Sequence, residues 1–278
     1  MMIDLPFGPC DVHRSGIGVP LLMIHGALVD HTLWDRIVPG LEPVADLIRP
    51  DLPIGAHRTP VTRRDLLHPE AIADALPRLL DALDVEQAAV IGSDTGGALA
   101  QIFTARHPDR VKGLILTSCD AFDHFPPTII KLLLPMLAIP GGIDVIANLY
   151  RTKRVRRSFM GAGLLLNHPV DDTIVKPWLR RLADSHENRK DVRAFLRACR
   201  PKLAHAAAHE LETFPRPALI AWSRGDRLFP DADAERLART IPDCELQWIE
   251  NTRTFSMIDQ PDALVALIRP FLERLSNL

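Results

Sequence analysis

The sequence predicts an α/β protein in which a mostly parallel sheet is flanked by helices and a helical segment is inserted late in the chain. Short apolar runs typical of buried strands alternate with helical patterns over most of the 278 residues. Between residues 125 and 205 the helical patterns continue without a credible strand. We therefore expect a core domain formed by residues 1–124 and 206–278, with residues 125–205 forming a helical cap.

Each expected strand is a short apolar run of the kind that is buried in a parallel sheet. These runs lie at residues 19–24, 44–49, 88–91, 111–117, 217–222 and 244–249. Amphipathic or apolar helical patterns follow at residues 69–83, 98–103, 231–240 and 261–275. Pro77 lies inside the first of these patterns, and we expect it to kink that helix.

Composition limits the possible classes of protein. A hydrophobic content of 47% suffices for one sizeable core, and a net charge of -2 gives no nucleic-acid signature. The cysteines form no zinc pattern and are expected to be reduced; they are Cys10, Cys119, Cys199 and Cys244. The N-terminus lacks a signal-peptide pattern, and no apolar run approaches the ~20 residues of a membrane span. We expect a cytoplasmic protein without metal, cofactor, nucleic-acid partner or membrane partner.

Residues 92–97, Gly-Ser-Asp-Thr-Gly-Gly, lie between a predicted strand and a predicted helix. Gly92 and Gly96 permit the close backbone approach of a sharp strand-to-helix turn, the nucleophile elbow, which exposes the residue midway between them. Here that residue is Asp94. A carboxylate nucleophile attacks carbon to form an ester, which suits the opening of epoxides or carbon–halogen bonds. The simpler alternative is a glycine-rich turn with Asp94 as a helix cap.

Three further motifs favour the elbow. His25-Gly26 follows a predicted strand, Pro108-Asp109-Arg110-Val111 leads into another, and Trp222-Ser223-Arg224-Gly225-Asp226 follows a third. With these motifs the chain resembles an α/β-hydrolase of the branch that contains epoxide hydrolases, haloalkane dehalogenases and haloacetate dehalogenases. The resemblance covers nearly the whole chain, and it is more specific for the fold than for the reaction.

The resemblance implies an oxyanion or halide site made of two backbone N–H groups. One belongs to Thr95, and the other belongs to Ala27 or Leu28. His25 is expected to brace the loop that carries the second donor, and Trp34 is a further candidate for substrate contact.

The resemblance also implies an acid that orients a catalytic histidine. Asp226 matches the usual position of that acid, and Asp120 and Asp123 match an alternative position used by some dehalogenases. Each of these carboxylates has the simpler alternative of a loop-end cap or a solvated side chain.

The catalytic histidine itself is missing. Counting back from Gln260-Pro261 places Thr254 where the family has histidine, and no histidine follows His209. Threonine cannot act as a general base near neutral pH. Three hypotheses remain: His57 or His124 acts instead from the catalytic edge of the sheet, Asp94 acts as a general base in a lyase, isomerase or cyclase, or the scaffold only binds a ligand.

The substrate is expected to be a small organic molecule such as an epoxide, a halo-acid or an ester. Thr95 and Ala27 stand where haloalkane dehalogenases have halide-binding side chains, so cleavage of simple alkyl halides is not expected. Epoxide hydrolases polarise the epoxide oxygen with two tyrosines of the cap, and this chain has the single tyrosine Tyr150, so it lacks that pair. Residues 126–205 contain 15 Lys and Arg and 6 Asp and Glu, a balance of +9. A basic cap could attract an anionic substrate, or its charges could form a solvated face that docks on the acidic core.

Overall fold

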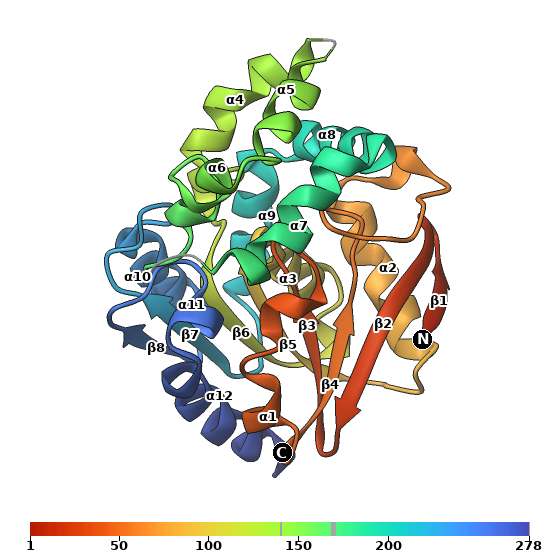
Figure 1. Cartoon of the computed structure of the whole chain (residues 1–278). Helices are drawn as coiled ribbons and strands as arrows, with labels where there is room; N and C mark the ends of the chain where they lie inside the picture. The colour runs from red at the N-terminus through yellow and green to blue at the C-terminus, as the bar shows by residue number, and fades with distance from the viewer. Residues whose placement is uncertain (140, 168–170, 278) are drawn as a thin grey trace.

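An eight-stranded sheet forms the centre of the molecule, in the order β1-β2-β4-β3-β5-β6-β7-β8 (Figure 1). The structure is a computed structural model and describes residues 1–139, 141–167 and 171–277. Strand β2 runs antiparallel to both of its neighbours, and the remaining neighbouring pairs are parallel. Parallel strands place their carboxyl ends at one edge of a sheet, which is where ligands bind in such folds.

The strands are β1 (Met2–Leu5), β2 (Gly8–Gly16), β3 (Val19–Ile24), β4 (Ala45–Pro50), β5 (Ala88–Asp94), β6 (Val111–Cys119), β7 (Ala218–Ser223) and β8 (Cys244–Ile249). The six strand ranges predicted from sequence agree with β3 to β8 within a few residues. Strands β1 and β2 have no counterpart among the predicted ranges, and their burial alternates along the chain. A half-exposed antiparallel ribbon lacks the continuous apolar run that marks a central parallel strand.

The helices are α1 (Val38–Leu41), α2 (Pro69–Asp81), α3 (Thr95–Arg106), α4 (Thr128–Ala138), α5 (Gly142–Leu149), α6 (Lys153–Arg157), α7 (Asp172–Asp184), α8 (His186–Ala198), α9 (Pro201–Leu211), α10 (Asp231–Thr240), α11 (Ser256–Asp259) and α12 (Pro261–Ser276). Short 3-10 helices are η1 (His31–Trp34), η2 (Arg64–Leu66), η3 (Pro108–Arg110), η4 (Phe122–His124) and η5 (Ala162–Leu164). Helix α2 continues through Pro77. Among the described residues, no helix has the length and apolar character needed to cross a membrane.

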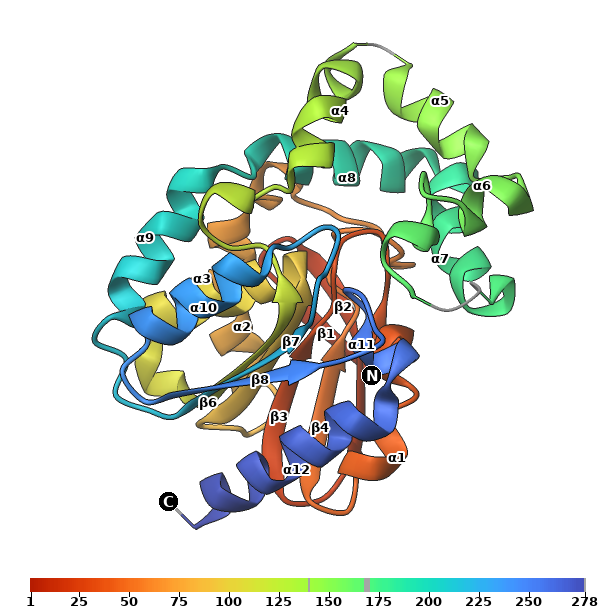
Figure 2. The same cartoon turned by 90° about the vertical axis from the view of Figure 1, so that its left-hand side faces the viewer.

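Helices cover both faces of the sheet. Helices α2, α3, α9 and α10 pack on one face, and α1, α11 and α12 pack on the other, each with its own buried apolar cluster (Figure 2). Helices α4 to α8, which we call the cap, lie above the carboxyl edge of the sheet (Figures 1 and 2). The expected boundary at residue 205 falls within α9, which packs along α3, and the division into two domains stays a prediction.

Candidate active site

A sharp turn joins β5 to α3, and Asp94 lies at its apex. Asp94 has φ 54° and ψ −133°, a backbone conformation that L-residues seldom adopt. A Cβ on Gly96 would lie 2.1 Å from the carbonyl oxygen of Ile24, and one on Gly92 would lie 2.4 Å from that of Gly96. Both glycines are therefore required by close backbone contacts, as expected for an elbow.

Two backbone amides hold one oxygen of the Asp94 carboxylate. Its Oδ1 accepts hydrogen bonds from the amide of Ala27 at 3.2 Å and from the amide of Thr95. The amide of Leu28 instead donates to the carbonyl oxygen of Ile54 at 3.2 Å, so Ala27 supplies the second donor. The pair of amides that the sequence placed around an oxyanion therefore surrounds an oxygen of Asp94 itself.

Asp226 lies in the loop after β7, where its carboxylate accepts several hydrogen bonds. Its Oδ1 accepts from the amides of Leu228 at 2.7 Å and Phe229 at 3.0 Å. The hydroxyl of the fully buried Thr254 donates to the same carboxylate, 3.2 Å from Oδ1 and 3.0 Å from Oδ2. Thr254 therefore lies beside this acid, the place where the resemblance puts a histidine.

The carboxyl groups of this region are buried close to one another. Burial raises the pKa of Asp94, and the charge of Asp226 raises it further, while the amides of Thr95 and Ala27 lower it. Burial also raises the pKa of Asp226. These directions follow from the cost of removing a charge from water and from repulsion between like charges.

Asp120 lies behind the elbow and was weighed in the sequence analysis only as an alternative acid. Its Oδ2 accepts a hydrogen bond of 2.9 Å from the hydroxyl of Thr95, and its side chain is fully buried. Burial, followed by the charge of Asp94, raises the pKa of Asp120 well above its usual value. This environment therefore disfavours the charged form of the Asp120 carboxyl group.

A cavity of about 340 Å³ lies between the elbow and the cap. Its polar floor is formed by Asp94 and Thr95, and its walls are almost entirely apolar. Among the described residues that line it, none is lysine or arginine. Apolar and aromatic wall residues from both the core and the cap include Leu133, Met136, Phe159, Met160, Trp178 and Phe255.

Two polar side chains of the cap also line the cavity. The indole N–H of Trp178 donates to Asp30 Oδ1 at 2.9 Å and to the hydroxyl of Thr32 at 2.7 Å, which fixes this ring to the core. Tyr150 is the second, and burial raises the pKa of its phenol. Its phenol is therefore protonated at neutral pH.

Sequence comparison agrees with this architecture. The sequence model of the alpha/beta hydrolase fold matches residues 19–261, most of the chain. The chain belongs to the alpha/beta hydrolase fold family. This finding confirms the fold class and the resemblance inferred from the sequence.

Several relatives of this alpha/beta hydrolase are named as hydrolases. The chain is 36% identical to 2-hydroxymuconate semialdehyde hydrolase from Pseudomonas sp. (strain CF600) over 113 residues, which is 38% of each chain. It is 24% identical to 2-hydroxy-6-oxo-6-phenylhexa-2,4-dienoate hydrolase from Burkholderia cepacia over 272 residues, which is 94% of this chain and 90% of that one. These matches make the chain a hydrolase-like member of the family.

Solved structures show the same fold. The ancestral haloalkane dehalogenase AncHLD2 has a TM-score of 0.82 at 20% identity, with all of both chains covered. The meta-cleavage product hydrolase CumD from Pseudomonas fluorescens IP01 has a TM-score of 0.75 at 21% identity, with 99% of this chain and 97% of that one covered.

The histidines weighed as replacements in this alpha/beta hydrolase do not line the cavity. The Nε2 of His57 lies 3.2 Å from Asp191 of α8, and Asn188 of α8 donates to the carbonyl oxygens of Gly55 and His57 at 2.8 Å. The Nδ1 of His124 lies 2.6 Å from Asp233. Both side chains thus have carboxylate partners outside the cavity, and neither takes the place of the missing histidine at Thr254.

The loop that carries His57 also touches the loop that carries the second amide. A Cβ on Gly55 would lie 2.3 Å from the nitrogen of Leu28, so the two backbones are in direct contact. His25 braces the same region: its Nδ1 lies 2.8 Å from the carbonyl oxygen of Gly26, and its Nε2 accepts from the amide of Leu52 at 2.9 Å.

Two other expected site residues lie elsewhere. The side chain of Asp123 is 74% exposed and pairs with His205 at 3.1 Å, so it does not face the cavity. Trp34 is fully buried in the apolar cluster beneath α11 and α12 and does not line the cavity. We correct both expectations: Asp123 lies in η4 with its side chain exposed, and Trp34 packs into the apolar core, a position that its residue type alone did not reveal.

The densest basic segment of the cap also has a structural component. Arg156 is buried, forms an ion pair of 2.6 Å with Asp172, and donates to the carbonyl oxygens of Tyr150 and Arg151 at 2.9 Å. This arginine therefore holds α6 against α7 and does not reach the cavity.

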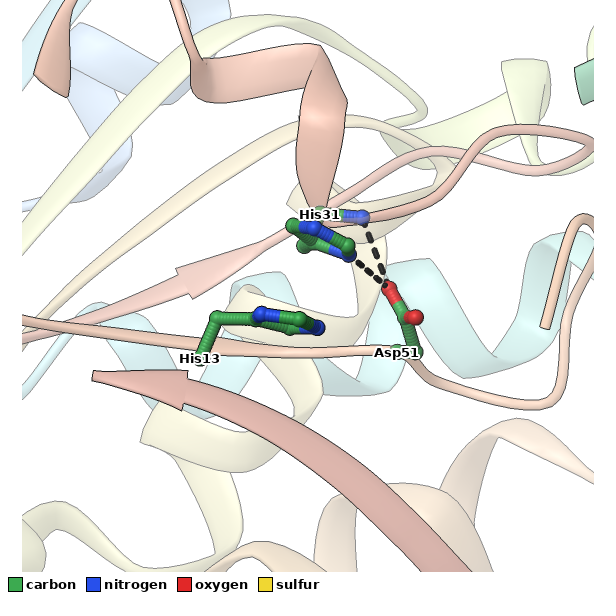
Figure 3. A group of neighbouring side chains, drawn as sticks. All are labelled: His13, His31 and Asp51. Atoms are coloured by element: carbon green, nitrogen blue, oxygen red, sulfur yellow. Dashed lines mark hydrogen bonds and ion pairs between the residues drawn. The ribbon is translucent and has the colours of Figure 1, made fainter. Parts of the chain in front are cut away.

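A separate cluster is formed by His13 of β2, His31 at the start of η1 and Asp51 directly after β4 (Figure 3). The rings of His13 and His31 stack at 3.5 Å, and the Nδ1 of His31 lies 2.8 Å from Asp51 Oδ1. Parallel rings direct their nitrogen lone pairs side by side, whereas metal binding needs lone pairs that converge. The arrangement is that of an ion pair covered by a second imidazole.

Proposed function

We propose that this protein forms a covalent ester between Asp94 and an uncharged apolar electrophile, with an epoxide as the favoured class. The observation that carries this proposal is the Asp94 carboxylate at the floor of an apolar cavity, with Oδ1 held by the amides of Ala27 and Thr95. These amides fix the carboxylate in place, so Oδ2 is the oxygen left to attack.

The reaction follows from this geometry. Oδ2 forms a bond to carbon while the carbon–oxygen bond of the epoxide breaks, and the electron pair of that bond goes to the leaving oxygen, which then takes a proton. The carbonyl oxygen of the new ester is Oδ1, which stays beside its two amides. Attack of water on the ester carbon places negative charge on Oδ1, where backbone donors stabilise it. The bond between this carbon and Oδ2 then breaks, Oδ2 takes a proton from the attacking water and leaves as a hydroxyl of the diol, and the oxygen of water restores the carboxylate.

Thr254 affects only the second half of this cycle. Its hydroxyl donates to Asp226 and cannot remove a proton from water near neutral pH. General base catalysis contributes roughly 10²–10⁴-fold to such a step. We therefore propose that ester formation is faster than ester hydrolysis, so that the covalent intermediate persists.

The lining supports an uncharged substrate. Burying a carboxylate without a partner is costly, and the described lining contains no lysine or arginine. The relatives named for dienoates act on carboxylates, as their names state, and the described lining of this cavity offers such a group no lysine or arginine. We therefore favour an uncharged epoxide over a halo-acid, and Tyr150 supplies a neutral phenol as a hydrogen-bond donor.

Intact-protein mass spectrometry tests the proposal. The protein is incubated with apolar epoxides, alkyl halides, halo-acids and activated esters, and Asp94→Asn serves as the control. We expect a persistent adduct with the mass of the whole epoxide, mapped to Asp94 and absent from the control. An adduct at equal yield on the Asn variant, or no adduct and unchanged substrate across the panel, would refute the proposal.

A second candidate is a lyase, isomerase or cyclase in which Asp94 is a general base. The raised pKa of Asp94 favours it, because a base is most effective when its pKa approaches the working pH. Product that forms without an adduct and without oxygen from labelled water would support this candidate. Stabilisation by ligands without any product would instead indicate a protein that only binds.

A further inference from the structure

Apolar side chains are exposed together on the cap. Leu132 of α4 is 76% exposed, and Phe159 and Met160 after α6 are each 60% exposed. The group, which we call the cap rim, consists of Leu132, Ile139, Val145, Leu149, Phe159 and Met160. Monomeric proteins seldom leave such a patch in water unless it contacts a protein or a membrane.

Part of the cap rim also lines the cavity. Val145, Leu149, Phe159 and Met160 line the cavity and also reach solvent. Helix α4 is almost entirely apolar in sequence, yet none of its residues with a described side chain is fully buried. Helices α4 and α5 project from the top of the molecule (Figures 1 and 2). The rim residues of α4 and α5 therefore lie on protruding helices, and Val145 and Leu149 of α5 belong to the cavity wall as well.

Positive charge lies beside the cap rim. Lys153, Arg154 and Arg157 of α6 are exposed and lie two to six residues before Phe159 in the chain. Within the part of the chain that the structure describes, these three side chains form no ion pair of 4 Å or less.

The acidic residues of the neighbouring helices are paired with other arginines. Asp144 pairs with Arg189, Asp172 with Arg156, and Asp184 with Arg151. Asp171, the exposed N-cap of α7, forms no ion pair within the described residues, so the three basic side chains still leave a net positive charge on this part of the cap.

We propose that the cap rim docks on the surface of an anionic phospholipid bilayer. Apolar side chains would enter the boundary between headgroups and acyl chains, while Lys153, Arg154 and Arg157 would lie among the phosphates. A protruding apolar tip suits a deformable lipid surface, and the adjacent basic residues select a negatively charged one. This interfacial contact departs from the sequence-based expectation of no membrane partner, and it does not require the chemistry proposed for Asp94.

Co-sedimentation of the full chain with vesicles tests this inference. We expect binding to vesicles of phosphatidylglycerol and phosphatidylcholine, weaker binding to phosphatidylcholine alone, and weakening by salt. Phe159→Glu should reduce binding by about tenfold or more, since burial of one aromatic side chain contributes at least that factor. Lys153→Glu with Arg154→Glu should also reduce it by about tenfold or more, since each basic residue contributes about fivefold.

The matched control is Ile17→Glu, which places the same charge on a 75% exposed residue in the β2–β3 turn, away from the cap. It should bind vesicles like the wild type, and circular dichroism confirms that each variant is folded. Absence of wild-type binding, or equal binding by the Phe159 and Ile17 variants, overturns the inference. A wild-type dimer that ignores vesicles and dissociates on Phe159→Glu also overturns it, and shows that the rim binds a second copy.

Discussion

Replacing Thr254 with histidine should restore the hydrolysis of the Asp94 ester. The Thr254 hydroxyl lies 3.0 Å from Asp226 Oδ2, so an imidazole N–H can donate to the same oxygen. The other ring nitrogen would then be free to accept a proton from water. Because a positioned general base contributes roughly 10²–10⁴-fold, we expect the ester to decay at least about 10²-fold faster in Thr254→His.

The substitution has a cost in stability that the structure bounds. Thr254 is fully buried, so a larger ring must displace its neighbours at a cost of about 1–3 kcal/mol. Native domains have about 5–15 kcal/mol of stability, so the variant should fold with a lowered Tm.

The assay loads each protein with the epoxide adduct, removes free reagent and follows the loss of the adduct by intact mass. Thr254→Val keeps the shape of the threonine but lacks a base, so its adduct should decay as slowly as that of the wild type. Adding Asp226→Asn to the histidine variant should remove most of the gain, because the imidazole loses the acid that orients it. A folded Thr254→His protein whose adduct decays at the wild-type rate would refute this account of Thr254.

Three other predictions follow from the same structure. Tyr150→Phe should slow adduct formation with epoxides by about tenfold or more and should not change the rate with alkyl halides, because only an epoxide oxygen needs a proton donor. Equal slowing with both classes of substrate argues against this role of Tyr150. The rate of adduct formation should rise with pH through a midpoint above the ordinary aspartate pKa, because only ionised Asp94 attacks and burial raises its pKa; a midpoint near 3.8, the ordinary value, contradicts this environment. Burial lowers the pKa of His31, but the hydrogen bond to Asp51 outweighs it, so the pKa of His31 is raised overall. The His31–Asp51 pair therefore contributes its full stabilisation below the ordinary histidine pKa and loses it as the pH rises through the raised pKa. His31→Gln should lose more unfolding free energy at pH 6 than at pH 9, and urea titrations at the two pH values measure the difference.

The elbow and its surroundings were predictable because their signals are local. Glycine spacing around Asp94 specifies a tight turn whatever surrounds it, and the count back from Gln260-Pro261 placed Thr254 beside Asp226 correctly. The identity of the second amide was not predictable, because Ala27 and Leu28 are adjacent and only the folded loop decides which N–H turns inward.

Side-chain direction in loops was the main source of error. Asp120 and Asp123 are three residues apart, yet Asp120 directly follows β6 and is buried, whereas Asp123 lies in η4 and is exposed. His57 lies in a loop at the catalytic edge, yet a helix more than 130 residues later supplies its partner. Contacts between such distant segments depend on how the cap lies on the core, which no local pattern encodes.

The hydrogen bonds between α8 and the loop around Gly55 limit how this protein can be redesigned. Asn188 donates hydrogen bonds to the carbonyl oxygens of Gly55 and His57. Gly55 is in close backbone contact with Leu28, and the neighbouring Ala27 donates its amide to Asp94. A cap grafted from another family member would lack the Asn188 contacts to this loop. The Ala27 amide that donates to Asp94 would then be held less firmly in place. A chimera that exchanges the cap between relatives should therefore include residues 52–58 together with the cap.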